Sequence, residues 1–188
     1  MVNIIISGVG GTGVILVSKI IMEVANNAKF DTKGSEVHGM AQRGGSVECH
    51  VRFGEKIYSP LIEKGTADFL LGFEQLETIR KLDYLSPNGR LIMSCDKIDP
   101  VPVQTGAVKY PDDIKQWISS HVKKHVFVDA NKACKKLGFK KALNVVMLGV
   151  LTRYLEFSDD VWEPAVKSLV KEKFVEMNLK AIELGKSL

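Results

Sequence analysis

A short run of glycines near the start of the chain has the spacing of a phosphate-binding turn. The run Gly8-Val9-Gly10-Gly11-Thr12-Gly13 fits the pattern G-x-G-x-x-G. Glycine lets the backbone turn tightly, and the amides at the start of a helix attract an anion there. The candidate binding residues of this turn are Gly8, Gly10, Gly11, Thr12 and Gly13.

The second concentration of functional side chains lies in residues 35–45. Its members are Ser35, Glu36, His38, Gln42 and Arg43. One interpretation is a catalytic pair of His38 and Glu36 beside an anion-binding Arg43. We favour a second interpretation, in which these groups hydrogen-bond to one another and shape a surface for a partner. The spacing alone assigns no catalytic residue.

Hydrophobic periodicity predicts the elements that position these groups. The apolar run at 3–7 predicts a buried strand, and residues 14–25 predict a helix whose polar positions fall on one face. Residues 32–45 carry scattered glycines and no clear periodicity, which predicts a long ordered loop. Such loops within compact domains are usually functional.

An antiparallel hairpin is expected after that loop. Ser46–Phe53 alternates between apolar and polar residues, which predicts a half-exposed strand. Cys49 then points inward as a small hydrophobic group, and His50 faces solvent or an interface. Gly54-Glu55 fits a two-residue turn that returns the chain through residues 56–59.

The rest of the chain alternates predicted strands and helices. Strands are expected at 67–71, 91–93 and 126–128, and helices at 72–84, 112–122, 129–138, 143–151 and 160–184. The expected fold class is therefore α/β, with a Rossmann-like, mostly parallel sheet, the inserted antiparallel hairpin and a C-terminal helical region at about 141–188. Residues 1–188 are expected to form a single domain.

Composition and charge exclude several classes of function. The net charge of +4 is mild and spread along the chain, so no nucleic acid is expected as a partner. No apolar run reaches membrane-spanning length, and the first apolar stretch lacks the basic region of a signal peptide. Cys49, Cys95 and Cys134 are far apart and share no local spacing, which indicates reduced thiols in a cytoplasmic protein and predicts no metal site.

A nicotinamide or flavin site would need an acidic residue about 20 residues after the glycine turn, at the end of the second strand. Asp31 lies at about that distance. Its predicted strand, 29–31, would be very short and would carry one apolar side chain, which makes it a poor support for a ribose contact. A purely structural turn between a strand and a helix is the other alternative, and both stay open here.

Three stretches together resemble one family closely. They are the glycine turn, the run Ser35-Glu36-Val37-His38-Gly39-Met40-Ala41-Gln42-Arg43-Gly44-Gly45, and Tyr58-Ser59-Pro60-Leu61-Ile62. The chain is similar to the gamma-type domain of 2-oxoacid:ferredoxin oxidoreductases, and most of all to the small (beta) subunits of the indolepyruvate branch. The resemblance covers nearly the whole chain. One departure is Thr12, where the family often has glutamine, and it leaves the turn intact.

This resemblance implies a subunit of an enzyme for the oxidative decarboxylation of an aryl 2-oxoacid such as indolepyruvate. Coenzyme A would accept the acyl group and ferredoxin the electrons. The larger (alpha) subunit would hold thiamine diphosphate, magnesium and the iron–sulfur clusters, and this chain would hold no cofactor and be inactive alone. The sequence agrees with that division, because no Gly-Asp-Gly precedes Asn26-Asn27, as a thiamine site would require.

Within the resemblance, the glycine turn and Arg43 become candidates for contact with the phosphates of coenzyme A or with the partner subunit. Two other functions stay open. One is a stand-alone nicotinamide- or flavin-binding oxidoreductase, and the other is a non-enzymatic assembly module.

Overall fold

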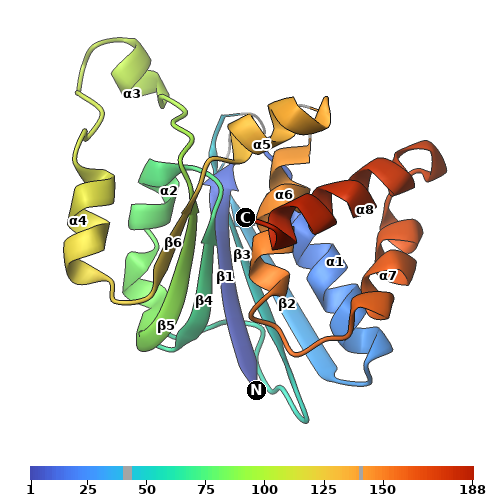
Figure 1. Ribbon diagram of the computed structural model, residues 1–188. Coiled ribbons are helices and arrows are strands. Elements are labelled where there is room, and N and C mark those ends of the chain that lie inside the picture. Colours follow the sequence, from blue (N-terminus) through green and yellow to red (C-terminus); the bar gives the residue numbers. More distant parts are fainter. Residues whose placement is uncertain (40–43, 140–141) are drawn as a thin grey trace.

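A six-stranded sheet with helices on both faces forms the framework of the chain (Figure 1). The computed structural model describes residues 1–39, 44–139 and 142–188. Within those ranges the strands lie in the order β2-β3-β1-β4-β5-β6. Their bounds are β1 (Val2–Val9), β2 (Asp31–His38), β3 (Ser46–Gly54), β4 (Ala67–Gly72), β5 (Leu85–Ser94) and β6 (His125–Val128).

Most of this sheet is parallel. The strands β1, β4, β5 and β6 run in one direction, whereas β3 runs antiparallel to both of its neighbours, β1 and β2. At the centre, Ile4, Ile5 and Ile6 of β1 have no exposed surface, because helices cover both faces of the sheet. The expected α/β class, with a mostly parallel sheet and an antiparallel insertion, is confirmed.

The helices form two layers. One face carries α1 (Val14–Asn27), α6 (Leu143–Thr152), α7 (Trp162–Leu169) and α8 (Glu172–Lys186), and the other carries α2 (Gln75–Ile79) and α4 (Ile114–His121) (Figure 1). The short α3 (Val101–Gln104) lies in the excursion between β5 and α4, and α5 (Ala130–Leu137) follows β6. The helix α6 is buried almost all round, as its apolar sequence predicts.

The expectation of a loop over 32–45 is wrong for its first half, because Thr32–His38 belong to β2. The hairpin therefore joins β2 to β3, and residues 56–59 form no strand after β3. The strand β2 is an edge strand with many polar residues, so it shows none of the apolar alternation that would reveal it in the sequence.

The predicted half-exposure of β3 is also wrong, because the polar face of this strand is covered. Glu48 is 6% exposed and His50 is 3% exposed. Cys49, on the opposite face, is buried as expected. Residues from outside the sheet cover the polar side chains, as described below.

Other differences concern the lengths of elements. The helix expected at 72–84 is split into α2 and a 3-10 turn at Leu82–Tyr84, and the one expected at 160–184 is split into α7 and α8. The strand β5 begins at Leu85, well before the expected 91, and its ladder with β4 shifts in register between the pairs Ala67–Leu85 and Phe69–Arg90. Asp129 caps α5, because its carboxylate accepts a hydrogen bond of 3.1 Å from the amide of Lys132. Among the described helices, none combines the length and the apolar content that crossing a membrane requires.

Candidate functional site

The glycine turn lies where β1 ends and α1 begins. The hydroxyl and the amide of Thr12 both donate hydrogen bonds to the carbonyl of Val9, at 2.7 and 3.0 Å, and close the turn. Gly11 and Gly13 have φ angles of +98° and +88°, which residues with a side chain rarely adopt. The turn therefore presents the first amides of a 14-residue helix at the carboxyl edge of the sheet.

Close neighbours leave no room for a side chain at two of these glycines. At a third, only the positive φ angle favours glycine. A Cβ atom on Gly8 would lie 2.9 Å from Val14 Cγ2, and one on Gly13 would lie 2.3 Å from Asn144 Nδ2. A Cβ atom on Gly11 would meet nothing within 4 Å. The outer side of the turn, at Gly11, is therefore open to a ligand.

The turn lies at the point where the sheet changes its direction of winding. The parallel neighbours β1 and β4 are followed by α1 on one face and by α2 on the other. Open α/β sheets bind ligands at such points, outside the carboxyl ends of their strands. The two strand ends are joined directly, since the amide of Phe73 donates a hydrogen bond of 2.8 Å to the carbonyl of Ser7.

The end of the 35–45 segment lies beside this turn. The amide of Gly10 donates to the carbonyl of Gly45 at 2.8 Å, and the amide of Gly44 donates to the carbonyl of Gly10 at 3.4 Å. Gln42 and Arg43, which the sequence analysis singled out, lie outside the described residues. Their neighbour Gly44 nevertheless fixes where that run rejoins the sheet.

The other three candidates of that segment lie on β2 and are not in a loop. Ser35 lies opposite His50, Glu36 opposite Cys49, and His38 opposite Val47. Because strand residues alternate between faces, Ser35 lies on the face opposite to Glu36 and His38. Glu36 is exposed. His38 of β2 and Gly8 of β1 both pair with Val47, so these two residues lie level with each other on either side of β3.

Asp31 lies at the wrong edge of the sheet for a dinucleotide site. It begins β2 opposite Gly54, whereas the glycine turn follows the far end of β1. Its carboxylate accepts a hydrogen bond of 2.8 Å from the amide of Ile57. The strand β3 also separates β2 from β1, so the parallel pair that carries the ribose-binding acid in Rossmann sites is missing from the described sheet.

A buried carboxylate that the sequence analysis did not single out lies at the end of β4. Glu74 is 1% exposed, and it accepts hydrogen bonds from the amides of Glu77 at 2.8 Å and Ile98 at 3.3 Å, and from the hydroxyl of Tyr110. Burial and the bond to Glu74 raise the pKa of Tyr110 above its ordinary value. Glu74 therefore caps α2 and anchors the excursion that contains α3.

A second buried cluster covers the polar face of β3. Nε2 of His50 lies 2.8 Å from Glu48 Oε1, and Lys81 forms an ion pair with the other oxygen of Glu48. The amide of Ile62 donates to Nδ1 of His50 at 3.0 Å, so the ring proton lies on Nε2, toward Glu48. The prediction that His50 faces solvent or an interface is therefore wrong. Its partners come from later segments, which local sequence cannot reveal.

This cluster changes the acidity of its carboxylate. The hydrogen bond from His50 and the ion pair with Lys81 lower the pKa of Glu48 from 4.5 to about 2, although burial opposes the shift. Glu48 is thus a structural anion that stays ionised at neutral pH.

The cysteines lie apart and are not activated as metal ligands. Burial raises the pKa of Cys49 to about 11 and raises that of Cys134 as well, so both thiols stay protonated at neutral pH. In the parts of the chain that the structure describes, no three His, Cys, Asp or Glu side chains gather as a metal site would require. These residues do not fit an iron–sulfur cluster.

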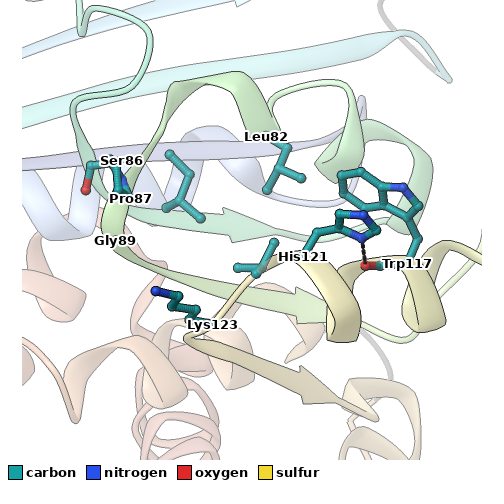
Figure 2. Close-up of a pocket in the computed structure, with 9 residues that line it drawn as sticks. Leu82, Ser86, Pro87, Gly89, Trp117, His121 and Lys123 are labelled. Carbon is teal, nitrogen blue, oxygen red and sulfur yellow. Dashed lines mark hydrogen bonds between the residues drawn. The ribbon is translucent and has the colours of Figure 1, made fainter.

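Two histidines lie in the segment that leads from the end of α4 into β6, and each bonds to a nearby backbone carbonyl. His121 stacks on Trp117 with ring centroids 4.2 Å apart, and its Nδ1 donates to the Trp117 carbonyl at 2.8 Å (Figure 2). His125 donates in the same way to the carbonyl of Val122 at 2.7 Å. The stacked pair borders a hollow of about 340 Å³ between α4 and the start of β5.

Comparison with known proteins gives consistent matches over the whole chain. The family model described as pyruvate ferredoxin/flavodoxin oxidoreductase matches residues 3–188. A protein named indolepyruvate oxidoreductase subunit IorB, from Archaeoglobus fulgidus, is 38% identical over 187 residues, which are 97% of this chain and 92% of the relative. A protein of the same name from Thermococcus kodakarensis is 35% identical over 188 residues, with 97% of this chain and 93% of the relative covered.

A solved structure agrees with this match. The gamma subunit of a keto/oxoacid ferredoxin oxidoreductase from Geobacter sulfurreducens superposes with a TM-score of 0.74 at 25% identity. The superposition covers 100% of this chain and 97% of that one.

Proposed function

Because the chain belongs to the pyruvate ferredoxin/flavodoxin oxidoreductase family, we propose that it is the small subunit of an indolepyruvate:ferredoxin oxidoreductase. The observation that carries this function is the 38% identity to an indolepyruvate oxidoreductase subunit, over 97% of this chain and 92% of the relative. The match spans the glycine turn, the β2–β3 region and the C-terminal helices alike. The family predicted from the glycine turn and the 35–45 segment is confirmed.

In the proposed complex an aryl 2-oxoacid loses carbon dioxide, its acyl group passes to coenzyme A, and ferredoxin accepts two electrons. Thiamine diphosphate and magnesium in the large subunit supply the decarboxylation chemistry, and iron–sulfur clusters there carry the electrons. The positions of Cys49, Cys95 and Cys134 support this division, because they share no local spacing of the kind that cluster ligands have. The three free cysteines also favour a cytoplasmic location.

The role of this chain is to hold an anionic group of coenzyme A at the glycine turn. Three features support that role: the amides at the start of α1, the open outer side of Gly11, and the placement of the turn at the carboxyl edge of the sheet. Arg43 supplies a guanidinium next in sequence to Gly44, whose amide bonds to Gly10. Amides at a helix start and a guanidinium both suit phosphate.

The surface formed by β2 and the residues that follow it would also contact the large subunit. Ser35, Glu36 and His38 on β2, with Gln42 and Arg43 after them, form the proposed contact surface. Two features of β2 support this: it has an unpaired outer edge in the described sheet, and Val37 is 52% exposed. Ferredoxin would then meet the complex through the large subunit, and the whole chain would act as one domain.

The stand-alone nicotinamide or flavin enzyme is the weaker alternative, because Asp31 lies at the opposite edge from the glycine turn. The assembly module differs from the proposed function in one respect, since it would not contribute to binding coenzyme A.

Co-purification tests the proposed function. An affinity-tagged large subunit of the same organism is expressed with this chain untagged, and the complex is analysed for stoichiometry, iron and thiamine diphosphate. We expect equimolar subunits, with all iron and thiamine retained by the large subunit when the two are separated. A small chain that does not co-purify, or that carries stoichiometric iron by itself, would overturn the assignment.

A further inference from the structure

Two adjoining hollows, both lined by Met1, lie at the edge of the sheet opposite the glycine turn. The label of the amino terminus marks this edge in Figure 1. We name the first the aromatic hollow. It has a volume of about 330 Å³. Its wall contains five aromatic rings, from Phe30, Phe53, Phe69, Tyr154 and Phe157.

The rings of the aromatic hollow pack as a wall and do not fill the space. The centroids of Phe53 and Phe157 are 5.4 Å apart, and Phe30 lies 5.8 Å from Phe53 and 6.1 Å from Phe157. Phe30 nevertheless remains 39% exposed. An aromatic face is therefore available to a ligand in an offset or edge-on arrangement.

The second hollow, which we name the cationic hollow, has a volume of about 420 Å³ and shares Met1, Val2, Phe69 and Tyr154 with the first. It adds Arg90 and Lys124. The guanidinium of Arg90 lies 4.1 Å from the centroid of Tyr154, on the wall between the two hollows.

The charges of the cationic hollow are not neutralised within the described chain. Neither Arg90 nor Lys124 has a carboxylate within 4 Å among the described residues, and Lys124 donates to the carbonyl of Asn88 at 3.1 Å. Asp68 is the one acid on the wall of the cationic hollow, and its carboxylate accepts a hydrogen bond of 2.8 Å from the amide of Asn3, whereas the exposed Glu156 lines the aromatic hollow. The hollow therefore attracts an anion.

We propose that the joined hollows bind a small aromatic carboxylate. Its ring would lie among Phe30, Phe69 and Tyr154, and its carboxylate would meet Arg90 and Lys124. A guanidinium stacked on a tyrosine keeps its N–H edge free for two parallel bonds to a carboxylate. The volumes fall in the range of small-molecule sites, roughly 300–1,000 Å³. This site goes beyond the proposed function.

The hollow of Figure 2 provides an internal control. Its aromatic pair, Trp117 and His121, stacks with ring centroids 4.2 Å apart, and Lys123 lines the same hollow (Figure 2). Lys123 and Lys124 are adjacent in sequence and both exposed, so they form a matched pair.

Binding of indole-3-acetate to the full chain tests the site, by calorimetry and by saturation-transfer NMR. Indole, which lacks the carboxylate, and acetate, which lacks the ring, are the comparison probes. We expect indole-3-acetate to bind at least ten-fold more tightly than either. Lys124→Ala and Arg90→Gln should each weaken it about ten-fold or more, while Lys123→Ala should leave it unchanged.

Equal binding of indole and indole-3-acetate would overturn the proposal, and so would equal losses from Lys123→Ala and Lys124→Ala. Circular dichroism and thermal melting of each variant show that it is folded. Arg90→Lys, which keeps the charge and loses the fork, should fall between the wild type and Arg90→Gln. The experiment needs no coenzyme A and no large subunit, so its outcome is independent of the proposed function.

Discussion

The backbone amide of Gly10 donates a hydrogen bond of 2.8 Å to the carbonyl oxygen of Gly45. This bond joins the first glycine turn to the end of the second glycine-rich run, which are far apart in sequence. It places the glycine turn beside the end of the second of the three stretches that carry the family resemblance. A ligand held by the amides of α1 would therefore lie beside Gly44 and Gly45.

Arg43→Ala should weaken either the use of coenzyme A or the assembly with the large subunit. A hydrogen bond to a charged group contributes about 1.5–3 kcal/mol, so the expected loss is about ten-fold or more. The measurements are the apparent affinity for coenzyme A in the complex and the dissociation constant of the complex. Arg43→Lys should recover part of the loss, because it keeps the charge without the bidentate geometry.

Arg153→Ala is the matched control for that change, since Arg153 is exposed and follows α6, away from the turn. It should change neither constant. If Arg43→Ala behaved like Arg153→Ala in both measurements, Arg43 would be a solvated side chain with no role at the site.

Gly11→Ala should lower the affinity for coenzyme A. Its φ of +98° is strained for alanine, at a cost of about 1–2 kcal/mol, and the new methyl group would project into the open side of the turn. Gly106→Ala is the control, because Gly106 also has a positive φ, +75°, and open space around it. The two variants should lose similar stability in urea unfolding, and only Gly11→Ala should lose affinity. Equal affinities for the two would remove the turn from the binding site.

Glu48→Gln should change how stability depends on pH. The pKa of Glu48 is about 2 in the folded chain and 4.5 as a reference for the unfolded chain. Its contribution, on the order of 3 kcal/mol, is therefore complete above pH 4.5 and is lost as pH falls toward 2. Between pH 5 and pH 3 the free energy of unfolding should fall more for the wild type than for Glu48→Gln.

Glu163→Gln is the control for the pH measurement, because Glu163 forms an exposed pair with Lys167. Its pH dependence should match that of the wild type. If the stability of Glu48→Gln also depended on pH as that of the wild type does, the assigned role of Glu48 would be wrong.

Tyr110→Phe should loosen the excursion between β5 and α4. The change removes the hydroxyl that donates to the buried carboxylate of Glu74, and an unsatisfied group of this kind costs about 1–3 kcal/mol. Hydrogen exchange at the amides of Leu76 and Ile98 should become faster. Tyr58→Phe, at a tyrosine that is 88% exposed, should have no effect. Unchanged exchange in Tyr110→Phe would show that Glu74 does not anchor this segment.

Much of the fold is predictable from local patterns. The apolar run before Gly8, the glycines after it and the cap at Asp129 each act within a few residues, so periodicity and capping rules identify them. The β2 strand was missed because its stability comes from pairing with β3 and not from an apolar face. The break between α7 and α8 was missed because Val170 and Lys171 adopt extended backbone without a proline or glycine to mark it.

The candidate site was harder to predict than the fold. The spacing of its glycines identifies the glycine turn. The contact between Gly10 and Gly45 depends on sheet topology, which the spacing does not reveal. The burial of Glu48 and His50 depends on Lys81 and on the amide of Ile62, which lie in later segments. Alternation within β3 identifies a polar face and carries no information about what covers it.

The reduction of ferredoxin by indolepyruvate in the presence of coenzyme A tests the central claim most directly. The rate is measured for the large subunit alone, for this chain alone, and for the two mixed in equal amounts. The assignment as a small subunit predicts turnover only in the mixture, with saturation at one chain per large subunit. Full activity from the large subunit alone would contradict it.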